Sequence, residues 1–340
     1  MKPSLFRYFG ILTTCLVCVA SAQNRKDAVR PPQLPDTAVP EIAGTGNFSH
    51  IVASLEESVA FYHDVLGLDV ATPPGSFSPN PAIMKLGNTI GAQSRVAVVK
   101  VPGAAIGLEL IEYKDIDRKP AHPRFQDPGT GNFAIQLKDI AEVADRIKKS
   151  GAHVLTLAGS PVDIGSEKGF FVQDPDGFIV ELAQFNTPPP AAANAPGNLF
   201  GASVEITVAD TDQTAKFYRD MGFTMRVGDS FTNNKLMADT SGTPGATFRQ
   251  SSTTVPGSMV RISFIEFKNI DRKPLRTRVQ DPGTAIIQLR VRDVDEAMKK
   301  FKAAGATVIS TGGEPVTMGN RNLAIVRDPN NLFLELLPAQ

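Results

Sequence analysis

A basic motif able to bind anions occurs twice in this chain, as DRKPAHPRFQDPGT at 117–130 and DRKPLRTRVQDPGT at 271–284. In the first copy, Arg118 and Arg124 could hold a carboxylate or a phosphate group through bidentate hydrogen bonds. Alternatively, these arginines and their counterparts pair with nearby acidic residues and fix a crossover between structural units. The acidic residues in reach are Glu112, Asp127, Glu266 and Asp281. Because the motif recurs in both halves, we favour the structural role.

Other reactive side chains are few. The four histidines are His50, His63, His122 and His153, and both cysteines, Cys15 and Cys18, lie near the start of the chain. The sequence contains no serine nucleophile elbow, phosphate-binding glycine loop, dinucleotide fingerprint or zinc-ligand spacing. No local motif therefore indicates a catalytic class.

The first 22 residues have the pattern of a secretion signal. Lys2 and Arg7 form a basic start, Phe9 to Ala20 is apolar, and Ala20-Ser21-Ala22 is a small-residue cleavage site. The apolar run is shorter than the roughly 20 residues of a spanning helix. We therefore expect a secreted or periplasmic protein cleaved near Ala22. The mature chain would lack cysteine and hence any disulfide or thiolate chemistry.

Composition indicates an ordinary globular protein. Of the 340 residues, 42% are hydrophobic and 21% charged, which excludes a disordered chain and a membrane bundle. Lys and Arg number 35, as do Asp and Glu, so the chain lacks the basic surplus typical of nucleic-acid binders. We expect no nucleic-acid partner and no membrane contact beyond the signal.

The chain divides into two similar halves. We expect a Pro-rich tether at 23–45, a first domain at 46–186, a linker at 187–198 containing PPPAAANAPG, and a second domain at 199–340. The basic motifs are offset by 154 residues (271 − 117), as are Glu181 and Glu335 (335 − 181). A repeat held in register over this length indicates duplicated structure.

Each half divides again into two units. Four short polar residues, each followed three positions later by Glu or Gln, predict helix starts at Ser54, Asp139, Asp210 and Asp293. Four glycines predict the helix ends at Gly67, Gly151, Gly222 and Gly305. An alternating strand precedes each cap and further strands follow each glycine. The unit is thus a strand, a helix and about three strands, repeated four times.

Three segments resemble the vicinal oxygen chelate superfamily, which includes glyoxalase I, extradiol dioxygenases and fosfomycin- and bleomycin-resistance proteins. They are SLEESVAFYHDVLGLDV at 54–70, DPDGFIVEL at 174–182 and DTDQTAKFYRDMGF at 210–223. The resemblance covers nearly all of 46–338. It implies an α+β fold of four βαβββ modules, paired into two domains with cup-shaped mixed sheets. We expect the two modules of each half to share a cup.

The resemblance also implies where metal ligands belong, at inward positions of the first and last strands of each module. In the first domain these positions are Asn47, Glu109, Asn132 and Glu181, and in the second they are Ser203, Ser263, Ile286 and Glu335. None is a histidine. An oxygen-only set suits Mg²⁺, Mn²⁺ or Ca²⁺. Glu109 and Glu181 would then bind the ion or act as general base. Alternatively they are remnants, satisfied by the two asparagines or by water.

His50 is not expected to join this set. Strand residues alternate between faces, so if Asn47 and Ser49 face the cup, then His50 faces the helix. His63 and His153 are expected in solvent. Glu205, Glu335 and His122 are further candidates for substrate contact.

Two functional hypotheses follow from the resemblance. The first is an exported enzyme that binds a small organic molecule in the first cup, as a metal-dependent lyase, isomerase or dioxygenase. The second is a metal-free binding or sequestration protein of the bleomycin-resistance kind. A scaffold without a ligand is a third reading. The oligomeric state is left open.

Export gives a direct prediction. Because the signal should be removed after Ala22, the mature protein should begin near Gln23 and be absent from the cytoplasmic fraction. Mass spectrometry of the purified protein checks this, and an intact 1–22 segment on soluble intracellular protein would contradict it.

Overall fold

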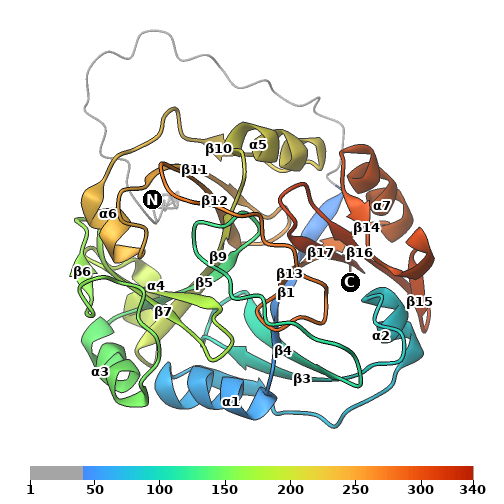
Figure 1. Ribbon diagram of the computed structural model, residues 1–340, viewed down its shortest axis with the longest axis horizontal. Helices are drawn as coiled ribbons and strands as arrows, with labels where there is room; N and C mark the ends of the chain where they lie inside the picture. Colours follow the sequence, from blue (N-terminus) through green and yellow to red (C-terminus); the bar gives the residue numbers. More distant parts are fainter. Residues whose placement is uncertain (1–40, 340) are drawn as a thin grey trace, which may run out of the picture.

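The computed structural model describes residues 41–339, so the predicted signal and most of the predicted tether lie outside the described residues. The described chain forms two mixed β-sheets with helices around them, shown in Figure 1. Sheet A has the strand order β14 (Thr307–Val308), β16 (Arg321–Arg327), β17 (Phe333–Pro338), β13 (Ala285–Val291), β1 (Ile42–Val52), β4 (Gly107–Lys114), β3 (Gln93–Lys100) and β2 (Asp69–Thr72), with β15 (Val316–Met318) beside β16. Sheet B has the order β10 (Arg226–Val227), β11 (Thr247–Thr254), β12 (Arg261–Lys268), β9 (Leu199–Thr207), β5 (Gly131–Leu137), β8 (Ile179–Phe185), β7 (Glu167–Gln173) and β6 (Val162–Asp163).

The helices are short. They are α1 (Leu55–Ala60), which continues as a π-helical segment, Phe61–Val65, then α2 (Pro81–Leu86), α3 (Ile140–Ser150), α4 (Pro190–Asn194), α5 (Thr211–Asp220), α6 (Lys235–Thr240) and α7 (Val294–Ala303). The helix α4 lies inside the segment predicted as a linker, and β1 begins four residues before the predicted start of the first domain. Within residues 41–339, no helix combines the length and the apolar character needed to cross a membrane.

The predicted helix boundaries of the four modules are confirmed. Ser54, Asp139, Asp210 and Asp293 each accept a hydrogen bond from a backbone N–H of the first turn. The four glycines predicted to end the helices all have positive φ, from 75° at Gly151 to 106° at Gly305. Sequence-local capping therefore fixes where each module turns from helix to strand.

The expected α+β fold of four βαβββ modules in two mixed sheets is also confirmed, but the modules pair differently. In sheet A, β1 of the first module pairs antiparallel with β13 of the fourth. In sheet B, β5 of the second module pairs antiparallel with β9 of the third. The expectation that both modules of one half share a cup is therefore wrong, because each sheet takes one module from each half (Figure 1).

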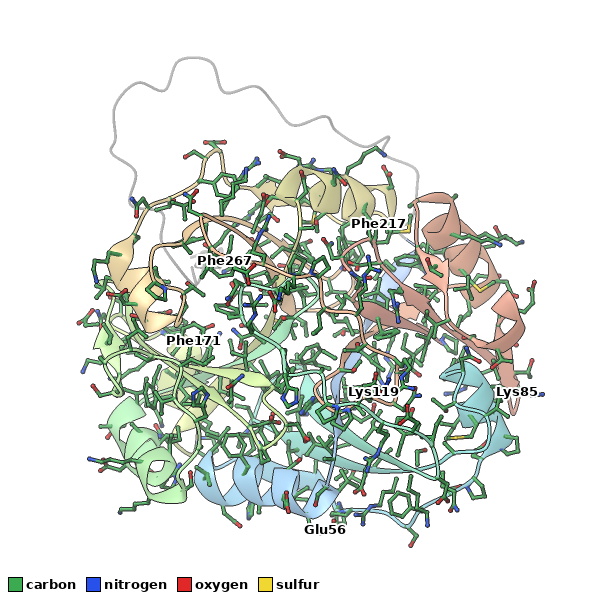
Figure 2. All side chains as sticks on the ribbon, viewed as in Figure 1. Glu56, Lys85, Lys119, Phe171, Phe217 and Phe267 are labelled. Carbon is green, nitrogen blue, oxygen red and sulfur yellow. The ribbon has the colours of Figure 1, made fainter. Side chains whose placement is uncertain are left out.

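One apolar core joins the two sheets. Alternate strand residues of both sheets contribute to it, and the ring of Phe48 on β1 stacks on that of Phe133 on β5 at 6.2 Å between centroids. The opposite faces carry smaller clusters, which on sheet B include Phe171 and Phe267, labelled in Figure 2. We call the face of each sheet that turns away from the shared core its cup face.

This pairing predicts how the two halves behave when separated. Residues 46–186 alone lack β9 and β13, so each of their sheets would end at an exposed β1 or β5 with unpaired backbone groups. We expect each half alone to unfold without a cooperative transition, and an equimolar mixture with 199–340 to regain one.

Circular dichroism melting curves and sedimentation of the separate and mixed halves measure this. Two monomeric halves that each unfold cooperatively would contradict the pairing. Cleavage of the intact protein near Pro190, which leaves both sheets complete, is the matched control.

Candidate functional site

The cup face of sheet A carries a closed network of two carboxylates, an amide and a hydroxyl. Ser49 Oγ donates to Glu109 Oε2 at 2.7 Å, and Gln288 Nε2 donates to Glu109 Oε2 at 2.8 Å and to Glu335 Oε2 at 3.0 Å. The side-chain oxygen of Gln288, Oε1, accepts from the backbone N–H of Asn47 at 2.8 Å. A single amide thus bridges both carboxylates and the neighbouring strand.

Burial dominates the electrostatics of this network. It raises the pKa of Glu109 against the hydrogen bonds from Ser49 and Gln288. Burial and the charge of Glu109 raise the pKa of Glu335 to about 7. The Oε2 atoms of both carboxylates accept hydrogen bonds from the protein's own side chains.

The cup face of sheet B carries a second network that is not closed. Asn132 Nδ2 lies 3.5 Å from Glu181 Oε2 and 3.5 Å from Glu205 Oε2. Asn132 and Glu205 are directly opposed in the antiparallel ladder of β5 and β9, and Glu181 reaches the pair from β8. The cross-half strand pairing therefore creates this site.

A third carboxylate, Glu167 on β7, belongs to the same electrostatic cluster. Burial, followed by the charge of Glu205, raises the pKa of Glu167 to about 7, and Arg261 opposes the shift. Burial raises the pKa of Glu205 to about 7, against Asn132 and Arg261. Burial, followed by the charges of Glu205 and Glu167, raises the pKa of Glu181 well above its usual range. Three carboxylates in one buried region cannot all ionise without a large electrostatic cost.

Several polar atoms of this cluster lack hydrogen-bond partners within the described residues. They are Asn132 Oδ1, Glu181 Oε1 and both carboxylate oxygens of Glu167. Buried polar atoms are normally paired, so orphaned acceptors mark a place for a proton, water or ion. If the Asn132 side-chain amide is rotated by 180°, its Oδ1 faces Glu181 and Glu205, and three oxygen atoms able to ligate a metal then converge. This donor set fits a hard divalent cation such as Mg²⁺ or Mn²⁺.

The two sheets divide the predicted metal-binding set. Asn47 and Glu109 lie in sheet A, whereas Asn132 and Glu181 lie in sheet B. The prediction that Glu109 and Glu181 share one ion is therefore wrong. The second-domain positions divide in the same way, because Ser203 and Ser263 lie in sheet B and Ile286 and Glu335 in sheet A.

The predicted substrate residues are placed as follows. Glu205 lies beside Asn132 in sheet B, Glu335 lies in the hydrogen-bond network of sheet A, and His122 lies in the loop between β4 and β5. Sequence reasoning missed Ser49, Gln288 and Glu167. Gln288 sits two positions after the predicted Ile286 on the same face of β13, so strand alternation allowed either residue.

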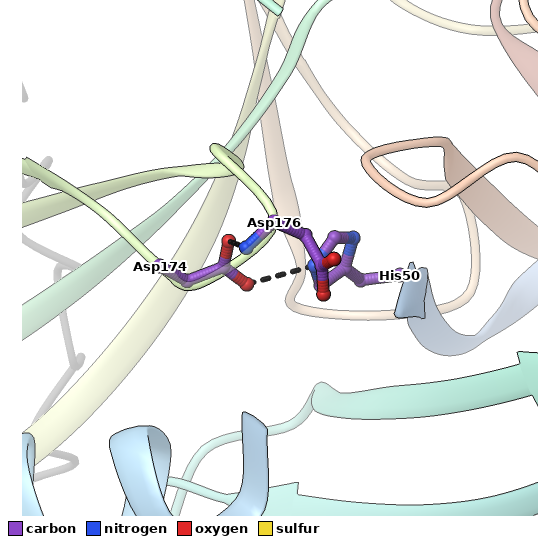
Figure 3. A group of neighbouring side chains, drawn as sticks. All are labelled: His50, Asp174 and Asp176. Carbon is purple, nitrogen blue, oxygen red and sulfur yellow. Dashed lines mark hydrogen bonds and ion pairs between the residues drawn. The ribbon is translucent and has the colours of Figure 1, made fainter. Parts of the chain in front are cut away.

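The predicted orientation of His50 is confirmed, because it faces the helices and is fully buried. Its Nε2 lies 2.8 Å from Asp174 Oδ2, which also accepts from Tyr62 Oη at 3.0 Å. Burial alone would lower the pKa of His50, but the charge and hydrogen bond of Asp174 outweigh it and the pKa is raised. Figure 3 shows His50 and Asp174 together with Asp176, whose carboxylate accepts from Ala53 N.

His50, Asp174 and Asp176 form the group of three potential ligands, within the described chain, whose ligand atoms lie within 4.8 Å of one another. The second half builds the same contacts without the histidine and with asparagine in place of the second aspartate. There, Tyr218 donates to Asp328, and Ala209 N donates to Asn330 Oδ1. A pattern that recurs without the histidine and the second carboxylate is best explained as a structural clamp between modules.

The other histidines lie outside both networks. His63 Nδ1 contacts Leu68 O at 2.7 Å, and His153 Nδ1 contacts Gln173 Oε1 at 2.6 Å. His50, His63 and His153 thus bond to groups outside the two cup-face networks.

The structural reading of the repeated arginines is supported. Arg124 binds Asp127 through Nε and Nη2, and Arg278 binds Asp281 in the same manner. Glu112 instead pairs with Arg95. Each arginine also pairs with an aspartate of the opposite loop, Arg124 with Asp271 and Arg278 with Asp117, both at 3.0 Å, so the arginines brace the two loops against each other.

Comparison with known proteins agrees with this architecture. Among curated proteins, the chain is 37% identical to a lactoylglutathione lyase of Oryza sativa over 91 residues, 26% of this chain and 28% of that protein. It is 29% identical to a lactoylglutathione lyase of Neisseria meningitidis over 137 residues, 39% of this chain and 84% of that protein. The chain thus spans little more than a quarter of the plant relatives' length.

Solved structures show the same fold over most of the chain. Glyoxalase I from Zea mays superposes with a TM-score of 0.57 at 19% identity, over 88% of this chain and 92% of that one. The sequence model of the Glyoxalase/Bleomycin resistance protein/Dioxygenase superfamily matches residues 46–182 and 202–336. Since these segments make up most of the chain, the protein belongs to this superfamily.

Proposed function

We propose that this protein is an enzyme of the lyase or isomerase kind that moves a proton on a small oxygen-bearing organic molecule, with its active site at Asn132, Glu181 and Glu205 of sheet B. The proposal rests on one observation. Two buried carboxylates share one amide there, burial raises the pKa of both, and orphaned oxygens lie beside them.

The raised pKa values of these two carboxyl groups suit acid–base chemistry. With a pKa of about 7, Glu205 can both accept and return a proton near neutral pH. Burial and the charges of Glu205 and Glu167 raise the pKa of Glu181, which favours its protonated form, and that form can donate a hydrogen bond to a substrate oxygen. A carbon acid next to a carbonyl group is the class of substrate that such a pair can activate.

A divalent cation fits this proposal. It would take the place of the proton on Glu181, because Asn132 and the deprotonated carboxylates of Glu181 and Glu205 would hold it, and when bound it would polarise substrate oxygens and stabilise enolate-like charge. The dioxygenase option is disfavoured by the donor set. Non-haem iron sites use histidine, and all four histidines lie elsewhere.

Sheet A supports a different role. Gln288 occupies the space between Glu109 and Glu335 and satisfies both, much as a bound ion would. This observation favours the second hypothesis, metal-free binding of a small molecule, for the cup face of sheet A. We also propose that the protein acts after export, on the strength of its N-terminal 22 residues alone.

The cation gives the first test. Mn²⁺ or Mg²⁺ should raise the melting temperature of the purified protein by mass action, and Glu205→Gln and Glu181→Gln should each abolish the response. Glu335→Gln, the matched change on sheet A, should retain it. A response lost only in Glu335→Gln would move the site to sheet A, and a wild-type protein indifferent to ions and chelators would leave the metal-free binding protein.

Catalysis gives the second test, with lactoylglutathione as the probe because the matched relatives are named for it. In D₂O, the protein should accelerate exchange of the proton on the hydroxyl-bearing carbon of the lactoyl group, followed by mass spectrometry. Glu205→Gln should lower the rate about 100-fold or more. Exchange no faster than in buffer, or unchanged in Glu205→Gln, would count against proton transfer at this site.

Stability should depend on pH with a defined sign. Glu167 and Glu205 have pKa values near 7 in the folded protein and near 4.5 in the unfolded chain. The folded state therefore holds more protons between these limits, and the free energy of unfolding should fall as pH rises from 5 to 8.

Urea unfolding at several pH values measures this slope. Glu205→Gln should flatten it and stabilise the protein at pH 8, while Glu314→Gln, at an exposed loop position, should leave it unchanged. A wild-type free energy of unfolding that rises over this range would contradict the assigned protonation.

A further inference from the structure

A basic cavity lies where the two repeated loops meet, and no residue of the two cup-face networks lines it. Its volume is about 490 Å³, and its lining comes from 119–127 and 273–281. Lys119, labelled in Figure 2, lies on one loop, and Lys273, its counterpart at an offset of 154 (273 − 119), lies on the other. The cavity therefore has equivalent walls from the two halves.

Reciprocal hydrogen bonds hold these walls in place. Lys119 N donates to Asp281 Oδ1 at 2.8 Å, and Lys273 N donates to Asp127 Oδ1 at 2.7 Å. Ala121 N and the equivalent Leu275 N donate to carbonyl groups of the opposite loop, each at 2.8 Å. Four cross-loop bonds in two equivalent pairs make a preformed frame.

The two acidic residues of the lining are already committed. Asp127 accepts from Arg124 and from Lys273 N, and Asp281 accepts from Arg278 and from Lys119 N. Neither carboxylate has an oxygen left without a donor. They therefore offer little attraction to a cation entering the cavity.

The remaining cations have no partner of opposite charge. In residues 41–339, no ion pair is formed by the side chains of Lys119, Lys273 or Arg276. Four basic and two acidic residues give the lining a net charge of +2 (4 − 2), in a chain whose overall charge is zero. The positive charge is thus concentrated at this junction.

A neighbouring arginine adds to the surplus. Arg327 Nη2 donates to Thr277 O at 2.6 Å, while its Nε has no hydrogen-bond partner among the described residues. Burial and then the positive charge of Arg276 lower the pKa of Arg327. Two guanidinium groups held together without a carboxylate would gain from an anion between or beside them.

We propose that this cavity, lined by Lys119, Lys273 and Arg276, binds a small polyanion carrying at least two oxyanion groups. Because the equivalent residues Lys119 and Lys273 lie on opposite loops, the cavity suits a ligand that carries negative charge at both ends. Phosphoric anhydrides and polycarboxylates share this chemistry. Since the loops lead directly into β5 and β13, the bound anion would tie together the two halves.

Calorimetric titration of the full-length protein at constant ionic strength tests the proposal, with pyrophosphate and citrate as probes. At least one should bind saturably at one site per chain, and the tighter of the two identifies the phosphate or the carboxylate source. Lys273→Gln and Arg276→Gln should each weaken binding tenfold or more, and Lys119→Gln should weaken it similarly.

Lys149→Gln is the matched control, because Lys149 is exposed on α3 and far in sequence from both loops. It should leave the affinity unchanged. The melting temperature without anion should be unchanged or higher in Arg276→Gln, since a repulsion with Arg327 is removed. The proposal would be overturned if neither pyrophosphate nor citrate bound saturably, or if Lys149→Gln weakened binding as much as the cavity variants.

Discussion

The antiparallel pairing of β1 with β13 and of β5 with β9 is the constraint on which the rest of the structure depends. Each ladder joins a module of one half to a module of the other, and its register decides which side chains meet. Asn132 lies opposite Glu205 only because β5 and β9 are aligned as they are. A slip of β5 by one residue would turn Asn132 into the shared core, where Phe133 now lies, and away from Glu205.

The duplicated modules have diverged into two different solutions for buried carboxylates. Ser49 and Glu205 are equivalent, as are Gln288 and Ala134, while Glu335 and Glu181 are conserved between the copies at an offset of 154. Sheet A supplies an amide where sheet B has a methyl group. The low dielectric of the interior strengthens the hydrogen bonds that Gln288 donates to its two carboxylates in sheet A. In sheet B the same low dielectric raises the free-energy cost of the acceptors that lack a partner. Within the described residues, only the sheet B arrangement has buried acceptors left for a proton or an ion.

The sequence was sufficient for features determined by near neighbours. Helix caps, C-terminal glycines and the helix-facing side of His50 follow from spacings of a few residues, and all are found. The partner of each strand is not encoded this way, because β1 has the same alternation whether it pairs with β5 or with β13. The metal-binding set predicted from the sequence therefore combined residues that lie in two different sheets. Glu167 was missed for a related reason, since its role comes from charges on other strands.

The repeated loop motif accounts for the strand pairing physically. Asp127 and Asp281 each bind the backbone of the opposite loop, and the Pro-Gly-Thr that follows leads within a few residues into β5 or β13. Gly129 and Gly283 have φ values of 96° and 91°, and a Cβ at Gly129 would lie 2.8 Å from Asn330 O. The motif must keep its glycine and its aspartate to start both strands at matched heights. The same requirement gathers basic residues of both copies around one axis, so the positive cavity is a consequence of the device that aligns the sheets.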